Sequence, residues 1–149
     1  MNDGRYFLDT NVFVYCFHPP TGKKRQIARA LVSRALRDGL GTISFQVVQE
    51  FYTALYKSGS SLTETHKRNY LVEVLAPLCR VHSSIHLYQS CLEIAQMTGY
   101  SFYDSLILGA ASNAGCKTLF TEDLHAGQTV AGVEIVKPFS AHEHGEWAL

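Results

Sequence analysis

Short runs of β-branched and aromatic residues alternate with longer stretches of helical periodicity along this chain, and that alternation restricts the fold most strongly. Helical crossovers between consecutive strands are right-handed and give a parallel sheet that is covered on both faces. The chain is therefore predicted to be an α/β protein, a three-layer α/β/α sandwich around a central, mainly parallel sheet. We expect strands at residues 5–9, 41–45, 79–82, 117–120 and 133–136.

Helices are expected between these strands. One amphipathic helix runs from Thr21 to Asp38 with Ile27, Leu31 and Leu36 on one side. Another ends before Pro77, because proline lacks the N–H that would continue the helix. The segment 102–115 is apolar almost all round, which predicts a central, buried helix. The other expected helices are a short one at 11–17 stopped by Pro19 and Pro20, and those at 46–57, 63–76 and 84–97, the last closed by Gly99.

Composition indicates one globular domain over residues 1–149, with a core at about 5–136 and a polar tail at about 139–149. The chain is 46% apolar and 17% charged, which is typical of a folded domain without membrane spans. No signal peptide is apparent, so we expect a cytoplasmic protein with no membrane partner. The four cysteines lack CxxC spacing and are expected to be free thiols. In the tail, Trp147 and Leu149 either fold back onto the domain or contact another subunit.

Four carboxylates interrupt this pattern at unusual places. Asp9 ends the first expected strand, and Asp123 lies three residues after the strand at 117–120. Glu50 and Asp104 each continue an apolar stripe of their helix, where a surface carboxylate would occupy the opposite face. Sites in parallel sheets lie beyond the carboxyl ends of the strands. We therefore expect these four acids to lie near one edge of the sheet.

Acids that meet at one edge repel one another, and some would have to bind protons unless a cation neutralises them. Mg²⁺ prefers oxygen ligands and commonly binds a few carboxylates together with substrate phosphates. A bound metal polarises a phosphoryl oxygen and lowers the pKa of a coordinated water. The pattern predicts metal-assisted phosphodiester hydrolysis, with four metal-binding and catalytic residues: Asp9, Glu50, Asp104 and Asp123.

Each acid also has a simpler structural explanation. Asp9 can N-cap the helix that follows it. Ser101 and Asp104 fit a capping box at the start of the buried helix. Asp123 fits a turn with Thr121 as its local partner, and Glu50 can be solvated at the edge of its helix. Capping does not exclude metal binding, because a carboxylate at a helix start can still face the edge of the sheet.

The segments FLDTNVFVY (7–15), QEFY (49–52), YDSLILGAA (103–111) and TEDL (121–124), in this order and spacing, resemble the PIN-domain nucleases. The most similar group is the VapC-type toxins of bacterial toxin–antitoxin pairs, and the resemblance extends from about residue 5 to 136. It implies an endoribonuclease that depends on Mg²⁺ or Mn²⁺ and leaves 5′-phosphate and 3′-hydroxyl ends. It also implies a homodimer and a small antitoxin protein whose tail fills the active-site groove.

The family's metal-site acids correspond to Asp9, Glu50, Asp104 and Asp123. The resemblance further implies that Asn11 and Thr121 orient carboxylates or water. Glu122 stands at a position where the family varies, and we treat it as an additional ligand or neighbour of the site. The sparse basic content of this chain departs from many small RNA-cleaving toxins. The formal net charge is zero, so affinity for RNA must come from local patches or bound cations.

One helix holds six of the 13 basic residues, and such a cluster can bind phosphates without reading bases. The other interpretation is an ordinary solvated helix face. The RNA-binding candidates in this cluster are Lys23, Lys24, Arg25 and Arg29, followed by Arg34 and Arg37.

Three other functions compete with the nuclease hypothesis. A PIN-like module that binds RNA or protein without cutting would have no need for four such acids. Aspartyl phosphotransfer would use Asp9 as a nucleophile, but the phosphatases that do so carry a second aspartate where this chain has Asn11. A structural zinc site is suggested by residue types alone, since the spacing matches no standard finger; its ligands would be Cys79, His82, His86 and Cys91.

Overall fold

The computed structural model describes residues 4–18 and 22–140. Its centre is a six-stranded sheet with the order β3-β2-β1-β4-β6-β5. All neighbouring strands pair in parallel except β5 and β6. The sequence-based prediction of a mainly parallel sheet is confirmed. The strands are β1 Tyr6–Leu8, β2 Gly41–Ser44, β3 Cys79–Val81, β4 Thr118–Phe120, β5 Thr129–Val130 and β6 Val133–Val136.

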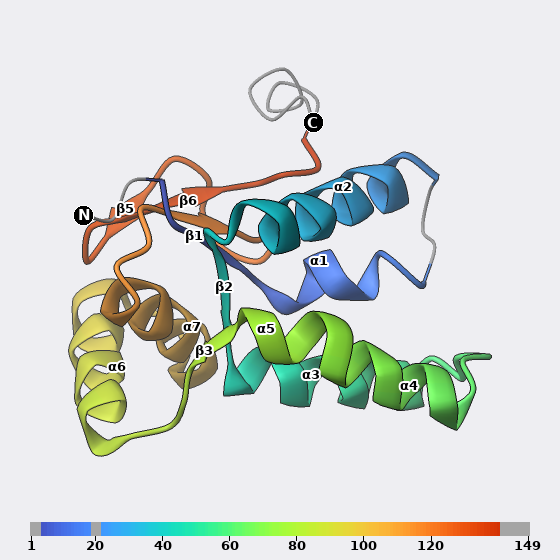
Figure 1. The fold of residues 1–149 in the computed structure, drawn as a ribbon. Helices are drawn as coiled ribbons and strands as arrows, with labels where there is room; N and C mark the ends of the chain where they lie inside the picture. The colour runs from blue at the N-terminus through green and yellow to red at the C-terminus, as the bar shows by residue number, and fades with distance from the viewer. Residues whose placement is uncertain (1–3, 19–21, 141–149) are drawn as a thin grey trace.

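Helices cover both sides of the sheet and complete the three layers (Figure 1). α1 and α2 lie on one side of β1 and β2, and the antiparallel pair α6 and α7 lies on the other. α3 runs beside α4 and α5 below the α1–α2 pair. The helices are α1 Thr10–Val14, α2 Gly22–Asp38, α3 Phe45–Lys57, α4 Glu64–Tyr70, the π-helical turn η1 Leu71–Leu75, α5 Ala76–Leu78, α6 Ile85–Thr98 and α7 Phe102–Asn113.

α7 is the central buried helix that its apolar composition predicts. Every residue from 105 to 111 is buried. Ser101 caps the helix by accepting a hydrogen bond from the Asp104 amide at 3.2 Å, which confirms one half of the predicted capping box. α6 ends as predicted at Gly99, whose φ of 76° is the left-handed conformation that glycine adopts without strain.

Three sequence-based expectations about the elements are wrong. The helix expected to stop before Pro77 continues as η1 and α5 to Leu78, because a new helical turn starts at the proline, where a missing N–H costs little. Leu36 was expected on the buried side of its helix but is 40% exposed. The antiparallel strand β5 was not expected, and two residues are too few to show a strand period.

Some expectations concern residues outside the described ranges. These are the stop at Pro19 and Pro20, the start of the second helix at Thr21, and the tail contacts of Trp147 and Leu149. All four cysteines are free, as expected. Within the described ranges, no helix is both long and apolar enough to cross a membrane.

Candidate active site

Asp9 occupies the carboxyl end of β1, where the strand turns directly into α1. Its side chain is the N-cap of α1 and accepts a hydrogen bond from the Thr10 amide at 2.7 Å. The other carboxylate oxygen accepts a hydrogen bond from Thr121 Oγ1, also at 2.7 Å. Thr121 follows β4, the strand beside β1, so adjacent strand ends supply both partners. The predicted N-cap is present, and the same carboxylate still faces the edge of the sheet.

The surroundings of Asp9 oppose its ionisation. The residue is only 6% exposed. Burial, reinforced by the charges of Asp123 and Glu50, raises the pKa of Asp9 to about 7, although the hydrogen bonds from Thr121 and Thr10 act in the opposite direction. Two further carboxylates are therefore close enough to interact electrostatically with Asp9. This interaction between acids from distant segments is what the sequence analysis predicts.

Thr10 connects α1 to α3 at this edge. Its hydroxyl donates a hydrogen bond to Glu50 Oε1 at 2.9 Å. Thr10 is the residue after Asp9, so one short segment positions two of the four acids. Sequence reasoning missed this role, although the place of Thr10 in the first helical turn after Asp9 was a usable signal.

Asp123 lies in the loop after β4 and is oriented by two neighbours. Its backbone N–H donates to Thr121 Oγ1 at 3.1 Å, as the predicted turn requires. Asn11 Nδ2 lies 3.5 Å from Asp123 Oδ2, a long hydrogen bond. Burial and the charges of Asp104 and Glu122 raise the pKa of Asp123, while Asn11 and Lys137 oppose the rise. Asp104, in the first turn of α7, thus belongs to the same electrostatic neighbourhood.

Glu122 is held by two side chains that sequence reasoning did not connect with it. Tyr15 donates a hydrogen bond to Glu122 Oε2. Lys24 forms an ion pair with Glu122 Oε1 at 2.9 Å and also lies over the Tyr15 ring. No sequence signal joins these residues, because they come from the end of α1, from α2 and from the loop after β4.

The basic cluster of α2 is only partly available for a ligand. Lys23 is exposed, but Lys24 pairs with Glu122. Arg25 Nη2 donates to the carbonyl oxygen of Phe17 at 3.1 Å, and Arg29 Nε donates to that of Cys16 at 3.2 Å. These contacts hold α2 against the end of α1. Phosphate binding by this cluster stays a prediction.

Oxygen atoms dominate the potential ligands at this edge of the sheet. Besides the carboxylates, Asn11 Oδ1 is buried and has no hydrogen-bond partner among the described residues. Carboxylate and amide oxygens are the ligands that Mg²⁺ and Mn²⁺ prefer, and an unpaired buried oxygen close to acids adds to this set. A magnesium ion needs only one or two carboxylates, because it keeps several waters. The chemistry of these residues therefore fits a divalent cation.

The structure does not arrange all four acids as direct ligands of one metal ion. In the described part of the chain, no group of three or more His, Cys, Asp or Glu side chains is arranged to hold a metal ion. The same finding applies to the four residues suggested as zinc ligands. One of them, Cys91, is buried, and its thiol donates to the carbonyl oxygen of Phe102. Joint ligation by Asp9, Glu50, Asp104 and Asp123 stays a prediction.

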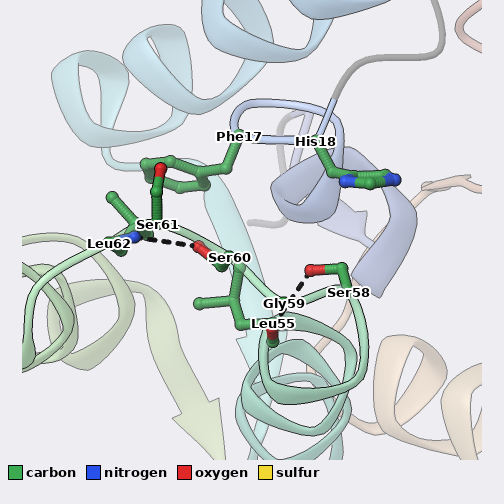
Figure 2. A pocket seen from close by; sticks show the side chains of 8 residues that line it. All are labelled: Phe17, His18, Leu55, Ser58, Gly59, Ser60, Ser61 and Leu62. Atoms are coloured by element: carbon green, nitrogen blue, oxygen red, sulfur yellow. Dashed lines mark hydrogen bonds between the residues drawn. The ribbon is translucent and has the colours of Figure 1, made fainter.

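A separate cavity of about 270 Å³ lies where the end of α1 meets the loop after α3 (Figure 2). None of the predicted site residues lines it. Ser58 and Ser60 use their hydroxyl oxygens in local hydrogen bonds to the loop backbone. The cavity is lined by Phe17, His18, Leu55, Ser58, Gly59, Ser60, Ser61 and Leu62.

The mainly parallel sheet, with helices on both sides, defines a three-layer α/β/α protein. The family comparison agrees: the PIN domain model matches residues 6–130. The chain belongs to the PIN domain family. By sequence, no curated protein is significantly similar to it.

Several solved structures have a similar fold. A toxin–antitoxin complex from Klebsiella pneumoniae aligns with a TM-score of 0.65 at 17% identity, covering 91% of this chain and 98% of the other. VapC20 from Mycobacterium tuberculosis, a toxin that cleaves the sarcin–ricin loop, aligns with a TM-score of 0.58 at 18% identity over 79% and 91%. FitAcB from Neisseria gonorrhoeae gives 0.58 at 19% identity over 89% and 97%.

Proposed function

We propose that this protein is a divalent-metal-dependent endoribonuclease and the toxin of a toxin–antitoxin pair. The observation that carries the proposal is the hydrogen-bonded connection of Asp9 with Glu50 and with the loop of Asp123, whose pKa is raised in part by the charge of Asp104. Thr121 contacts both Asp9 and Asp123, and Thr10 connects Asp9 to Glu50. Membership of the PIN domain family and the fold shared with toxin structures support the same conclusion.

The side chains of the site have distinct proposed roles. Asp9, Glu50, Asp104 and Asp123 would hold Mg²⁺ or Mn²⁺, and the cation would polarise the scissile phosphate and promote ionisation of the attacking water. Thr121 and Thr10 fix the rotamers of Asp9 and Glu50. Asn11 donates to Asp123 and keeps its own Oδ1 as a free acceptor.

Glu122 is proposed as a positioning residue because both of its oxygens are already engaged. The contacts from Tyr15 and Lys24 fix the loop that carries Asp123. Lys23 is exposed and remains a candidate for RNA phosphates. Lys24, Arg25 and Arg29 would have to exchange a protein contact for a phosphate.

The decisive experiment incubates the purified protein with total RNA and Mn²⁺ or Mg²⁺ and maps the new 5′ ends. We expect cleavage with either metal, no cleavage in EDTA, and a loss of at least about 100-fold in Asp104→Asn, because that change removes a full negative charge from the proposed metal site. Thermal unfolding of Asp104→Asn serves as the folding control. Equal cleavage by wild type and folded Asp104→Asn would contradict the proposal.

A non-catalytic PIN-like module is the second candidate, since the acids in the free protein do not form a three-ligand cluster. The same experiment separates the two. A binding module would retain RNA affinity in wild type and Asp104→Asn and would cut RNA in neither.

The proposed partners follow from the family and the surface. A small antitoxin and a cytoplasmic setting are proposed from the structural neighbours, which include toxin–antitoxin complexes. A homodimer is proposed because large apolar side chains are exposed on η1 and at the ends and middle of α6. These are Val72, Ile85, Leu92 and Met97.

A further inference from the structure

A groove of about 430 Å³ extends from the candidate active site along α3. This volume lies within the range of about 300–1,000 Å³ that is typical of small-ligand sites. One wall is α3 and the other is the first turn of α7, which carries Tyr103 beside Asp104. The groove is lined by Gln46, Gln49, Glu50, Thr53, Ala54, Lys57 and Tyr103.

Charge changes sign along this groove. Glu50 lies between Gln46 and Lys57 along α3, on the side of the acids, and accepts the hydrogen bond from Thr10. Lys57 is seven residues further along α3, which is two helical turns or roughly 10 Å along the axis. A ligand that reaches from the acidic cluster to Lys57 would thus place a negative group at the lysine. Consecutive phosphates of an RNA strand are closer together than this, so Lys57 would meet a phosphate further along the strand and not the one next to the scissile phosphate.

Gln46 supplies a hydrogen-bonding group without a partner in the wall of the groove. It is only 3% exposed, and its Nε2 donates to the carbonyl oxygen of Tyr103 at 3.2 Å. That bond defines the orientation of the amide. The Oε1 acceptor is buried and has no partner within the described ranges. Leaving such an acceptor unpaired is costly. The exocyclic amines and ring N–H groups of nucleobases are suitable donors.

Tyr103 supplies an aromatic surface at the mouth of the groove. Its side chain is 65% exposed, which is unusual for a large ring next to a candidate active site. Phe102 contacts it in a T-shaped arrangement at 5.4 Å, and the Gln46 hydrogen bond fixes its backbone. A positioned, exposed ring is the feature on which single-stranded nucleic-acid sites stack bases.

We propose that this α3 groove is a nucleoside subsite for single-stranded RNA, adjacent to the scissile phosphate. The base stacks on Tyr103 and donates a hydrogen bond to Gln46 Oε1, and a phosphate further along the same strand pairs with Lys57. The choice of RNA as substrate rests on the function proposed above. The new elements are the location of the nucleoside and the role of Gln46 and Tyr103 in selecting it.

The test measures the binding of a short, fluorescein-labelled single-stranded RNA by anisotropy in EDTA, so that metal-dependent cleavage does not interfere. We expect Tyr103→Ala to weaken binding about tenfold or more and Tyr103→Phe to bind like wild type, because the ring provides the stacking surface. Tyr56→Ala is the matched control: Tyr56 is 64% exposed and does not line the groove. Its loss should leave binding unchanged.

Lys57→Ala provides a second variant, at an exposed position at the end of α3 where folding is not at risk. It should weaken binding and reduce the slope of log K against log salt by about 0.7, as expected for one lost contact to a single strand. Unchanged affinity in both Tyr103→Ala and Lys57→Ala would overturn the proposal and leave a protein partner as the occupant. An equal loss in Tyr56→Ala would also overturn it.

Failure of the subsite and failure of the nuclease function give different results. If wild type binds RNA with this dependence on Tyr103 but never cleaves it, the subsite stands and the reaction does not. If wild type cleaves RNA and all variants bind and cleave alike, the nuclease stands and the subsite does not.

Discussion

Asp9 combines two roles that usually occur at different residues. It caps α1, which is a structural role, and it remains at the carboxyl edge of the sheet beside Glu50 and Asp123. The fold keeps this carboxylate buried although its ionised form is disfavoured there. Thr10 and Thr121 partly offset that cost, because each donates a hydrogen bond to Asp9.

The raised pKa of Asp9 makes stability depend on pH in a defined direction. The folded state holds the proton up to about pH 7, whereas the unfolded state loses it near the ordinary value of 3.8. The Asp9 contribution to the free energy of unfolding therefore falls as pH rises between these values, by up to about 1.4 kcal/mol per unit. In Asp9→Asn that contribution is absent, so the variant should gain stability relative to wild type as pH rises.

Urea unfolding of both proteins in EDTA across this pH range measures the difference. The midpoint of Asp9→Asn minus that of wild type should increase from pH 4 to pH 7. A difference that stays constant with pH would show that the folded protein carries Asp9 ionised throughout, contrary to this account.

At the scale of elements, β2 and α2 pack too closely for any side chain larger than hydrogen at Gly41. A Cβ atom there would lie 2.3 Å from Ala35 Cβ and 3.0 Å from Ala35 Cα. Both residues are buried, and Ala35 belongs to the last turn of α2. The short distance allows α2 to cover the strand that leads into α3 and Glu50.

Gly41→Ala should therefore destabilise the protein by about 1–3 kcal/mol, since the helix backbone has to move to relieve the overlap. Gly22→Ala is the matched control: it lies at the start of the same helix, and a Cβ there meets no atom of the described residues within 4 Å. Its effect should stay within about 0.5 kcal/mol. Denaturant midpoints give both values, and equal stability of the two variants would mean that the β2–α2 contact adapts without cost.

At the scale of the whole molecule, four separate segments contribute one acid each to the candidate site. Removing a single acid should therefore abolish activity while leaving most of the core untouched. For the proposed toxin this predicts a phenotype: expression of the wild-type chain alone should arrest growth of a bacterial host.

Asp104→Asn, expressed to the same level, should not arrest growth. Colony counts after induction, with protein amounts compared by immunoblot, measure both. Normal growth with abundant folded wild-type protein would argue against a toxin. Growth arrest by both proteins would show that toxicity does not depend on the acidic cluster.

Much of this architecture could be read from local patterns. Periodicity predicts the strands, the buried α7 and the ends of α6, because burial of one face is encoded in residue spacing. Neighbouring residues also encode Asp9 as an N-cap and the turn of Thr121 with Asp123. The π-helical turn and the continuation through Pro77 were not predictable in this way, since packing of the whole segment decides them.

The order of strand and helix segments and the placement of acids at their ends are properties of the sequence alone, because they depend on contacts between near neighbours along the chain. Only the tertiary structure could decide that Tyr15 and Lys24 hold Glu122, that Thr10 holds Glu50, and that Tyr103 and Gln46 form a groove with Lys57. These partners lie on different elements, so side-chain distances across the fold determine them, and no spacing in the sequence does.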